Sequence, residues 1–153
     1  MESKVNTQQI PEVKISYSFK VARENRIKVS SSMDGYNVLK KCYDPDTMQL
    51  RESAKILLLN RANQILGVYN LSEGGTSSTV VDVKMIVQAS ALSNASGVIL
   101  SHNHPSGNPL PSESDKALTR KVKSALQYMD VVLLDHIILT EEEFTSFADE
   151  GLM

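Results

Sequence analysis

The apolar positions along this chain predict several strands, most of them buried on both faces. Continuous apolar runs of the kind found in strands covered on both sides of a sheet lie in residues 52–60, 97–100 and 131–140. Residues 64–71 follow a hairpin turn, and residues 27–29 form a further short candidate strand. Residues 13–19 alternate strictly between apolar and polar side chains, which predicts a strand with one exposed face.

Helical spacing and capping residues predict three helices. They are expected at residues 33–43, 83–92 and about 113–129. Pro45 ends the first helix, and Asp82 caps the second. Ser112 stands at the N-cap of the third helix and Asp115 at its third position, which is a capping box with Asp in place of the usual Glu or Gln. Residues 141–153 close the chain, and a short helical turn is expected there.

The order of these elements predicts an α/β fold with a mixed central sheet and flanking helices. At 153 residues the chain is expected to form one domain. Residues 1–30 are expected to be an N-terminal extension, partly flexible and with one or two short strands, and residues 31–153 the folded domain. Residues 74–78, which combine two glycines with Ser and Thr, are expected to form a turn.

Composition and charge narrow the classes of function. The net charge is −2, so the balance gives no support for autonomous DNA binding, although it leaves DNA association open. Cys42 is the single cysteine, which excludes an intrachain disulfide and favours a reducing compartment. No apolar run is long enough to span a membrane, and the N-terminus has no signal-peptide pattern. We therefore expect a cytoplasmic protein without membrane contact, whose oligomeric state the sequence leaves open.

Residues 101–115 contain the side chains that are the best candidates for a metal site. His102 and His104 are two residues apart at the end of a predicted strand, so their side chains project to the same side. Asp115 follows after ten intervening residues, in the first turn of the next helix, from which it can reach the same point. Two imidazoles and a carboxylate form a ligand set for a catalytic zinc ion with one position open to water. A separate carboxylate is then needed as general base.

Other polar residues allow functional and structural interpretations. Glu73 is the main rival for the general base, but its place beside two glycines favours a turn residue. His136 allows two interpretations, a buried, hydrogen-bonded strand histidine, which is preferred, or a partner of the metal ligands. The Ser and Thr residues at 76–79 are interpreted as loop residues, because no free histidine is left to activate a nucleophile there.

These residues resemble a known pattern. His102-x-His104-Pro105, six further residues and Ser112-x-x-Asp115 match the JAMM signature of JAB/MPN-domain metalloproteases. The longer string that runs from Ser101 to Gly107 resembles the RadC-type branch specifically, over about residues 30–153. Further RadC-like segments are 58–63, 72–75, 135–138 and 146–147.

The resemblance implies a fold and a set of roles. The fold is a JAB/MPN sandwich related to cytidine deaminases. His102, His104 and Asp115 would be the ligands of Zn²⁺, and Glu52 would be the general base and then the acid. Ser112 would either hydrogen-bond the metal-bound water or stabilise the oxyanion formed on attack. Ala54 stands where the family usually has an aromatic residue. Longer RadC proteins also carry an N-terminal helical domain, which about 30 residues are too few to form.

Three hypotheses of function follow. The preferred one is a zinc-dependent JAMM-type hydrolase that cleaves an amide, peptide or isopeptide bond in a peptide or protein substrate. The alternative is a non-catalytic RadC-like binding module associated with DNA repair or mobile-element systems. A nucleoside deaminase is suggested by fold kinship alone, and the cysteine pair of such zinc sites is missing because Cys42 stands alone.

Overall fold

A five-stranded mixed sheet forms the centre of the computed structural model, which describes residues 11–14, 16–75 and 80–153. The strands, in the spatial order β2-β1-β3-β4-β5, are β2 (Ile65–Glu73), β1 (Ser53–Leu59), β3 (Gly97–Asn103), β4 (Val132–Leu139) and β5 (Phe144–Ser146). β3 and β4 pair in parallel, and the other neighbours pair antiparallel. The predicted α/β fold with a mixed sheet is confirmed.

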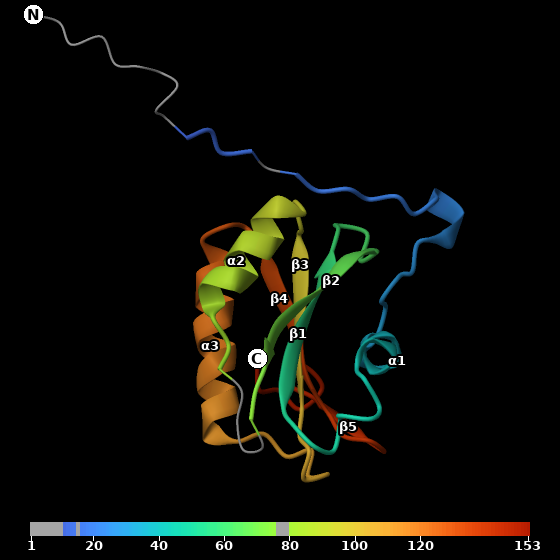
Figure 1. Ribbon diagram of the computed structural model, residues 1–153, viewed down its shortest axis with the longest axis vertical. Coiled ribbons are helices and arrows are strands. Elements are labelled where there is room, and N and C mark those ends of the chain that lie inside the picture. Colours follow the sequence, from blue (N-terminus) through green and yellow to red (C-terminus); the bar gives the residue numbers. More distant parts are fainter. Residues whose placement is uncertain (1–10, 15, 76–79) are drawn as a thin grey trace, which may run out of the picture.

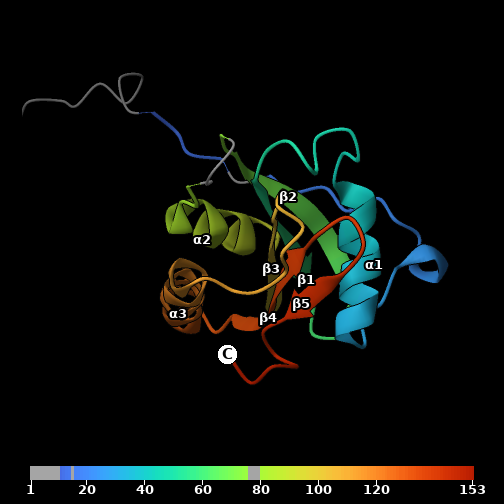
Figure 2. The ribbon, with the colours of Figure 1, turned by 90° about the horizontal axis from the view of Figure 1, so that it is seen from below.

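Helices cover both faces of this sheet. α1 (Ser32–Cys42) packs on one face, and α2 (Val83–Leu92) with α3 (Glu113–Gln127) on the other, as Figures 1 and 2 show from two directions. Each face has its own core, with Leu57 and Ile99 facing α1 while Ile56 and Leu100 face α2 and α3. The apolar runs predicted strands correctly because alternate residues of one strand enter different cores.

The N-terminal extension differs from its prediction. Among the described residues of 11–22 none belongs to a strand, and residues 27–29 contribute one isolated bridge, Lys28 to Gln64, beside the short 3₁₀ helix η2 (Arg23–Asn25). Most side chains of 11–22 are exposed, although the Tyr17 hydroxyl donates to the Leu66 carbonyl. An alternating pattern forms a strand only where a neighbouring strand and a covering layer accept it, and here it meets neither. Residues 1–10 lie outside the described part.

The chain end adds a strand to the expected short helical turn. Residues 141–153 contain the short strand β5, which pairs with β4, followed by turns in which the Glu150 N–H donates to the Ser146 carbonyl at 3.1 Å, as in a helix. The expected turn at 74–78 and the loop at 76–79 fall largely outside the described residues. None of the helices in the described ranges is both long and apolar enough to cross a membrane.

Candidate metal centre

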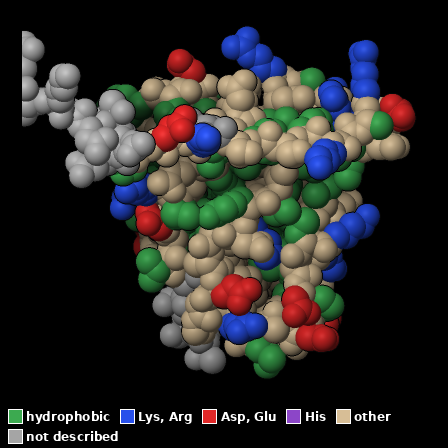
Figure 3. Space-filling view, turned by 45° about the horizontal axis from the view of Figure 1, so that its top comes forward, with side chains coloured by type: hydrophobic (Ala, Val, Ile, Leu, Met, Phe, Trp, Pro, Cys, Tyr) green, Lys and Arg blue, Asp and Glu red, His purple; other side chains and the backbone are tan. Residues whose placement is uncertain are grey.

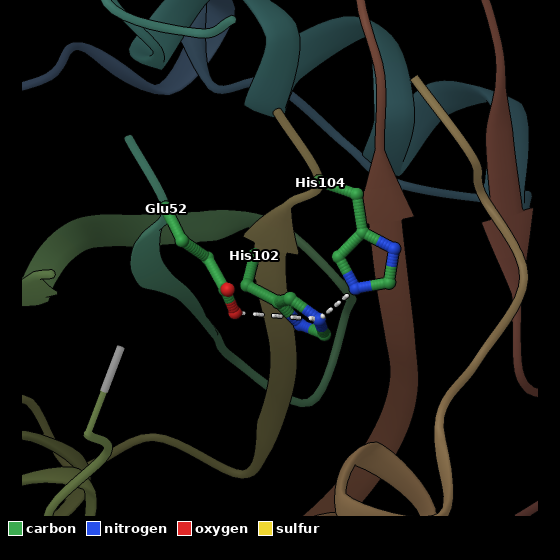
Figure 4. Close-up of side chains that lie close together, drawn as sticks. All are labelled: Glu52, His102 and His104. Atoms are coloured by element: carbon green, nitrogen blue, oxygen red, sulfur yellow. Dashed lines mark hydrogen bonds and ion pairs between the residues drawn. The ribbon is translucent and has the colours of Figure 1, made fainter. Parts of the chain in front are cut away.

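The register between β1 and β3 brings three of the candidate side chains onto one face. Ala54 of β1 lies opposite His102 of β3, and the same register continued by two residues sets Glu52 opposite His104. Because side chains alternate along a strand, Glu52, His102 and His104 share the face covered by α3. Figure 4 shows the Glu52 carboxylate and the His104 ring pointing toward the ring of His102. Ala54 is buried between them, and its small side chain leaves this face open to the imidazoles.

The distances between these side chains suit one metal ion. His102 Nε2 lies 2.9 Å from His104 Nε2 and 3.9 Å from Glu52 Oε1. One ligand atom from each of these three residues lies within 4.8 Å of the others. Tetrahedral zinc with bonds of about 2.0–2.1 Å separates its ligand atoms by about 3.3 Å, close to the spacing seen here.

Asp115 completes the group from the other side. Its Oδ1 lies 3.1 Å from His102 Nε2, and its Oδ2 lies 3.5 Å from His104 Nε2. The predicted capping box is present: the Ser112 backbone N–H donates to Asp115 Oδ2 at 2.8 Å, and the Asp115 N–H donates to Ser112 Oγ at 3.1 Å. Capping and metal binding are therefore compatible roles, because the cap holds Oδ2 on the side of His104 while Oδ1 faces His102 without a capping bond.

The electrostatics of the cluster follow from burial and from this pairing. Burial alone would raise the pKa of Asp115, but the adjacent imidazoles of His102 and His104 outweigh it and hold that pKa far below its usual range. The bond with Asp115 raises the pKa of His104 against the effect of its own burial. Burial raises the pKa of Glu52, and the neighbouring histidines oppose the rise. A base with a raised pKa is better matched to proton transfer near neutral pH.

The second ring nitrogen of each histidine is also bound. His104 Nδ1 lies 2.8 Å from the carbonyl oxygen of Asn108, which accepts only, so Nδ1 carries the proton and Nε2 faces the cluster. His102 Nδ1 lies 2.8 Å from His136 Nε2. His136 is buried and hydrogen-bonded in its strand as preferred from the sequence, and it also contacts His102 directly, which is the alternative that the sequence left open. Only the pairing of β3 with β4 reveals this contact.

Asn103 is a residue that sequence reasoning missed. Its amide oxygen accepts from the Ser53 backbone N–H at 2.8 Å and from the Ser53 hydroxyl at 3.2 Å. Its amide nitrogen donates to the carbonyls of Met48 and Arg51 at 2.7 and 3.0 Å. The fully buried amide thus holds the chain on both sides of Glu52. The one available signal was its position between the two motif histidines.

Two other candidates are placed by the structure. Glu73 is exposed and lies 3.8 Å from the guanidinium of Arg51, and it is not among the residues that meet at His102. Ser112 is an exposed N-cap whose oxygen accepts the Asp115 N–H, which leaves the hydroxyl proton free to donate elsewhere. A cleft of about 320 Å³ borders His104 and is lined by the 105–107 loop and residues 140–143.

Comparison with known proteins supports the family resemblance of the sequence motif. Residues 29–152 match the RadC-like JAB domain family. A UPF0758 protein of Flavobacterium johnsoniae is 40% identical over 126 residues, a region that makes up 82% of this chain and 53% of the relative's length. The UPF0758 protein YfjY of Escherichia coli K12 is 41% identical over 103 residues, a region that makes up 67% of this chain and 64% of the relative's length. This chain thus spans about half to two thirds of the length of these relatives. The match over residues 29–152 shows that the chain belongs to the RadC-like JAB domain family.

Proposed function

We propose that this protein is a zinc-dependent hydrolase of the JAMM type, which cleaves an amide, peptide or isopeptide bond in a peptide or protein substrate. The observation that carries the proposal is the convergence of acceptor atoms at the end of β3. The Nε2 atoms of His102 and His104 stand 2.9 Å apart, with the Asp115 carboxylate 3.1 Å from the first. Groups of this kind repel one another unless a cation or a proton lies among them.

The donor set fits zinc better than a harder cation. Two imidazole nitrogens and a carboxylate oxygen suit Zn²⁺, whereas Mg²⁺ and Ca²⁺ prefer all-oxygen sites. His102, His104 and Asp115 would hold the ion, and Glu52, at 3.9 Å from His102 Nε2, would stand beside it.

The roles of the side chains follow from their positions. A bound zinc ion would supply an acidified water and a polarised carbonyl. Glu52, whose pKa is raised by burial, would accept the proton of the attacking water and return it to the leaving amine. Ser112, with its hydroxyl proton free, would donate to the oxygen that becomes negative. His102, His104 and Asp115 keep their places without taking part in proton transfer.

The test separates metal binding from turnover. Glu52→Gln should retain the zinc of the wild type and lose hydrolysis by a factor of about 10²–10⁴, as expected for loss of a general base. Glu73→Gln is the matched control, because Glu73 is exposed and paired with Arg51, and it should leave both properties unchanged. Zinc is measured by elemental analysis, and hydrolysis by mass spectrometry of a mixed peptide library incubated with each protein.

Three results would count against the proposal. Full hydrolysis by Glu52→Gln would remove the assigned role of Glu52. A wild type that binds zinc and leaves every library peptide intact would contradict peptide cleavage. Salt-dependent DNA binding without hydrolysis would favour the binding-module alternative. On the face drawn in Figure 3, acidic and basic side chains are interspersed.

A further inference from the structure

A buried chain of hydrogen bonds connects one candidate ligand to the helix that carries another. His102 Nδ1 lies 2.8 Å from His136 Nε2, and His136 Nδ1 lies 2.7 Å from Thr119 Oγ1. Thr119 Oγ1 in turn donates to the backbone carbonyl of Asp115 at 2.8 Å. His136 and Thr119 are almost completely inaccessible to solvent, so water does not compete for these bonds. The residues come from β3, β4 and α3.

The protons of this chain can be assigned from its far end. The Thr119 hydroxyl has one proton, and the 2.8 Å approach to a carbonyl oxygen requires that proton to lie between the two oxygens. Thr119 Oγ1 must then accept from His136, so His136 carries its proton on Nδ1. A neutral His136 has an acceptor at Nε2, and His102 must therefore donate from Nδ1.

The opposite assignment leaves two groups in unfavourable contact. If Thr119 donated to His136, two oxygen lone pairs would face each other at 2.8 Å. A doubly protonated His136 would be a fully buried cation, and none of the ion pairs among the described residues includes His136. The groups around it are the Phe147 ring, stacked at 4.5 Å, together with His102 and Thr119.

We propose that Thr119 and His136 are positioning residues that fix the tautomer of His102, so that its Nε2 presents a lone pair to the metal centre. The chain ends on the carbonyl of Asp115, which ties the tautomer of one ligand to the first turns of the helix that carries the other. The link to metal rests on the proposed function, but the tautomer itself is a property of the metal-free protein. Hydrogen-bond partners of this kind change metal affinity by about 10–100-fold when removed.

The first measurement needs no variant. In the metal-free wild type at pH 8, long-range ¹H–¹⁵N correlation spectra report which ring nitrogen of each histidine carries the proton. We expect His102 and His136 both to be protonated on Nδ1. A proton on His102 Nε2 would overturn the proposal, whether or not the protein proves to be a hydrolase.

The second measurement removes the end of the chain. Thr119→Val has nearly the shape of threonine without the hydroxyl, and Thr119→Ser keeps the hydroxyl. With Val, His136 loses its acceptor and is free to reverse its proton, so the Nδ1 signal of His102 should weaken. Zn²⁺ affinity, measured against a competing chelator, should fall about tenfold or more with Val and stay within about threefold with Ser. Equal tautomers and equal affinities in all three proteins would contradict the proposal.

Substitutions at His136 test the other link. In Gln the side-chain carbonyl reaches about as far as Nε2 and can accept from His102, whereas in Asn it is one bond shorter and reaches only toward Thr119. His136→Gln should therefore hold the His102 tautomer better than His136→Asn. The reverse order would overturn the assignment. Circular dichroism of each variant shows whether the fold is retained, and the wild-type spectra decide the central point if a His136 variant does not fold.

Discussion

At the C-terminal end of β3, the polar residues on the two faces of the sheet differ in whether their hydrogen-bonding groups are satisfied within the protein. On the α1 side, the Asn103 amide makes four hydrogen bonds, and the Ser101 hydroxyl pairs with that of Tyr43 at 2.7 Å. On the α3 side, His102 and His104 direct nitrogen atoms at each other and at a carboxylate. Adjacent residues of one strand thus lie in a saturated network on one side and in a cluster of acceptors on the other.

This difference separates residues that stabilise the fold from residues that would bind a cation. The network around Asn103 is complete within the protein and fixes the segment that carries Glu52. The cluster at His102 and His104 is satisfied only by something added, whether a proton or a cation. We expect substitutions on the first side to alter stability, and substitutions on the second to alter metal response. The following predictions test that division, from the largest expected effect to the smallest.

The largest effect should come from Asn103→Ala. This change leaves the Ser53 N–H and the carbonyls of Met48 and Arg51 without their buried partner, and it should lower the free energy of unfolding by about 2–5 kcal/mol. Urea denaturation of the metal-free protein measures it. Asn37→Ala on the exposed face of α1 is the control, expected within about 0.5 kcal/mol of wild type. A loss below about 1 kcal/mol for Asn103→Ala would contradict the stabilising role assigned to the network around Asn103.

The second effect concerns added metal. Zinc at about 100 times its dissociation constant should stabilise the wild type by about 2.7 kcal/mol, because only the folded chain assembles the cluster. His104→Ala should lose most of this gain while changing the metal-free stability little, since His104 is only partly buried. Thermal unfolding with zinc and with a chelator measures both proteins. Equal zinc responses would place the metal somewhere else.

The smallest effect is a pH dependence that belongs to His136. Burial lowers its pKa well below the ordinary value of 6.5. At pH 7 neither state binds the proton, but below about pH 6.5 the unfolded chain does and the folded chain does not, so stability falls with falling pH. His136 should contribute a loss of about 1–2 kcal/mol between pH 7 and pH 5.

The control for this effect is His136→Gln, which has no titrating group at that position. His136 is the one titratable group that differs between the two proteins, so the difference between the two stability curves reports on it. The gap between wild type and variant should narrow as the pH falls. Parallel curves from pH 7 to pH 5, measured by denaturation without metal, would show that His136 is not excluded from protonation in the folded state.

The parts of the structure that depend on near neighbours could be predicted from the sequence. Asp82 and Ser112 cap their helices as the local pattern indicates, and the capping box with Asp115 is formed. His102 and His104 share a face because they are two residues apart in a strand. These features require only the backbone geometry of one segment, so a single sequence contains them.

The parts that depend on pairing between distant segments could not be predicted in this way. Glu52 reaches His102 through the register of β1 on β3, and only the family resemblance pointed to it. His136 and Asn103 find their partners 34 and about 50 residues away. Residues 13–19 show the reverse case, since their alternation is typical of a strand but none of the described residues in this range pairs with a strand.

The pairing of Ala54 with His102 has a consequence for how this molecule can change. Sheet side chains repeat every two residues, so a slip of one residue between β1 and β3 would carry Glu52 away from the histidines and, in the same movement, turn Ile56 out of its core. Insertions and deletions within either strand are therefore penalised twice. Loops at the far ends of the strands carry no such double penalty, and variation in length should be tolerated there.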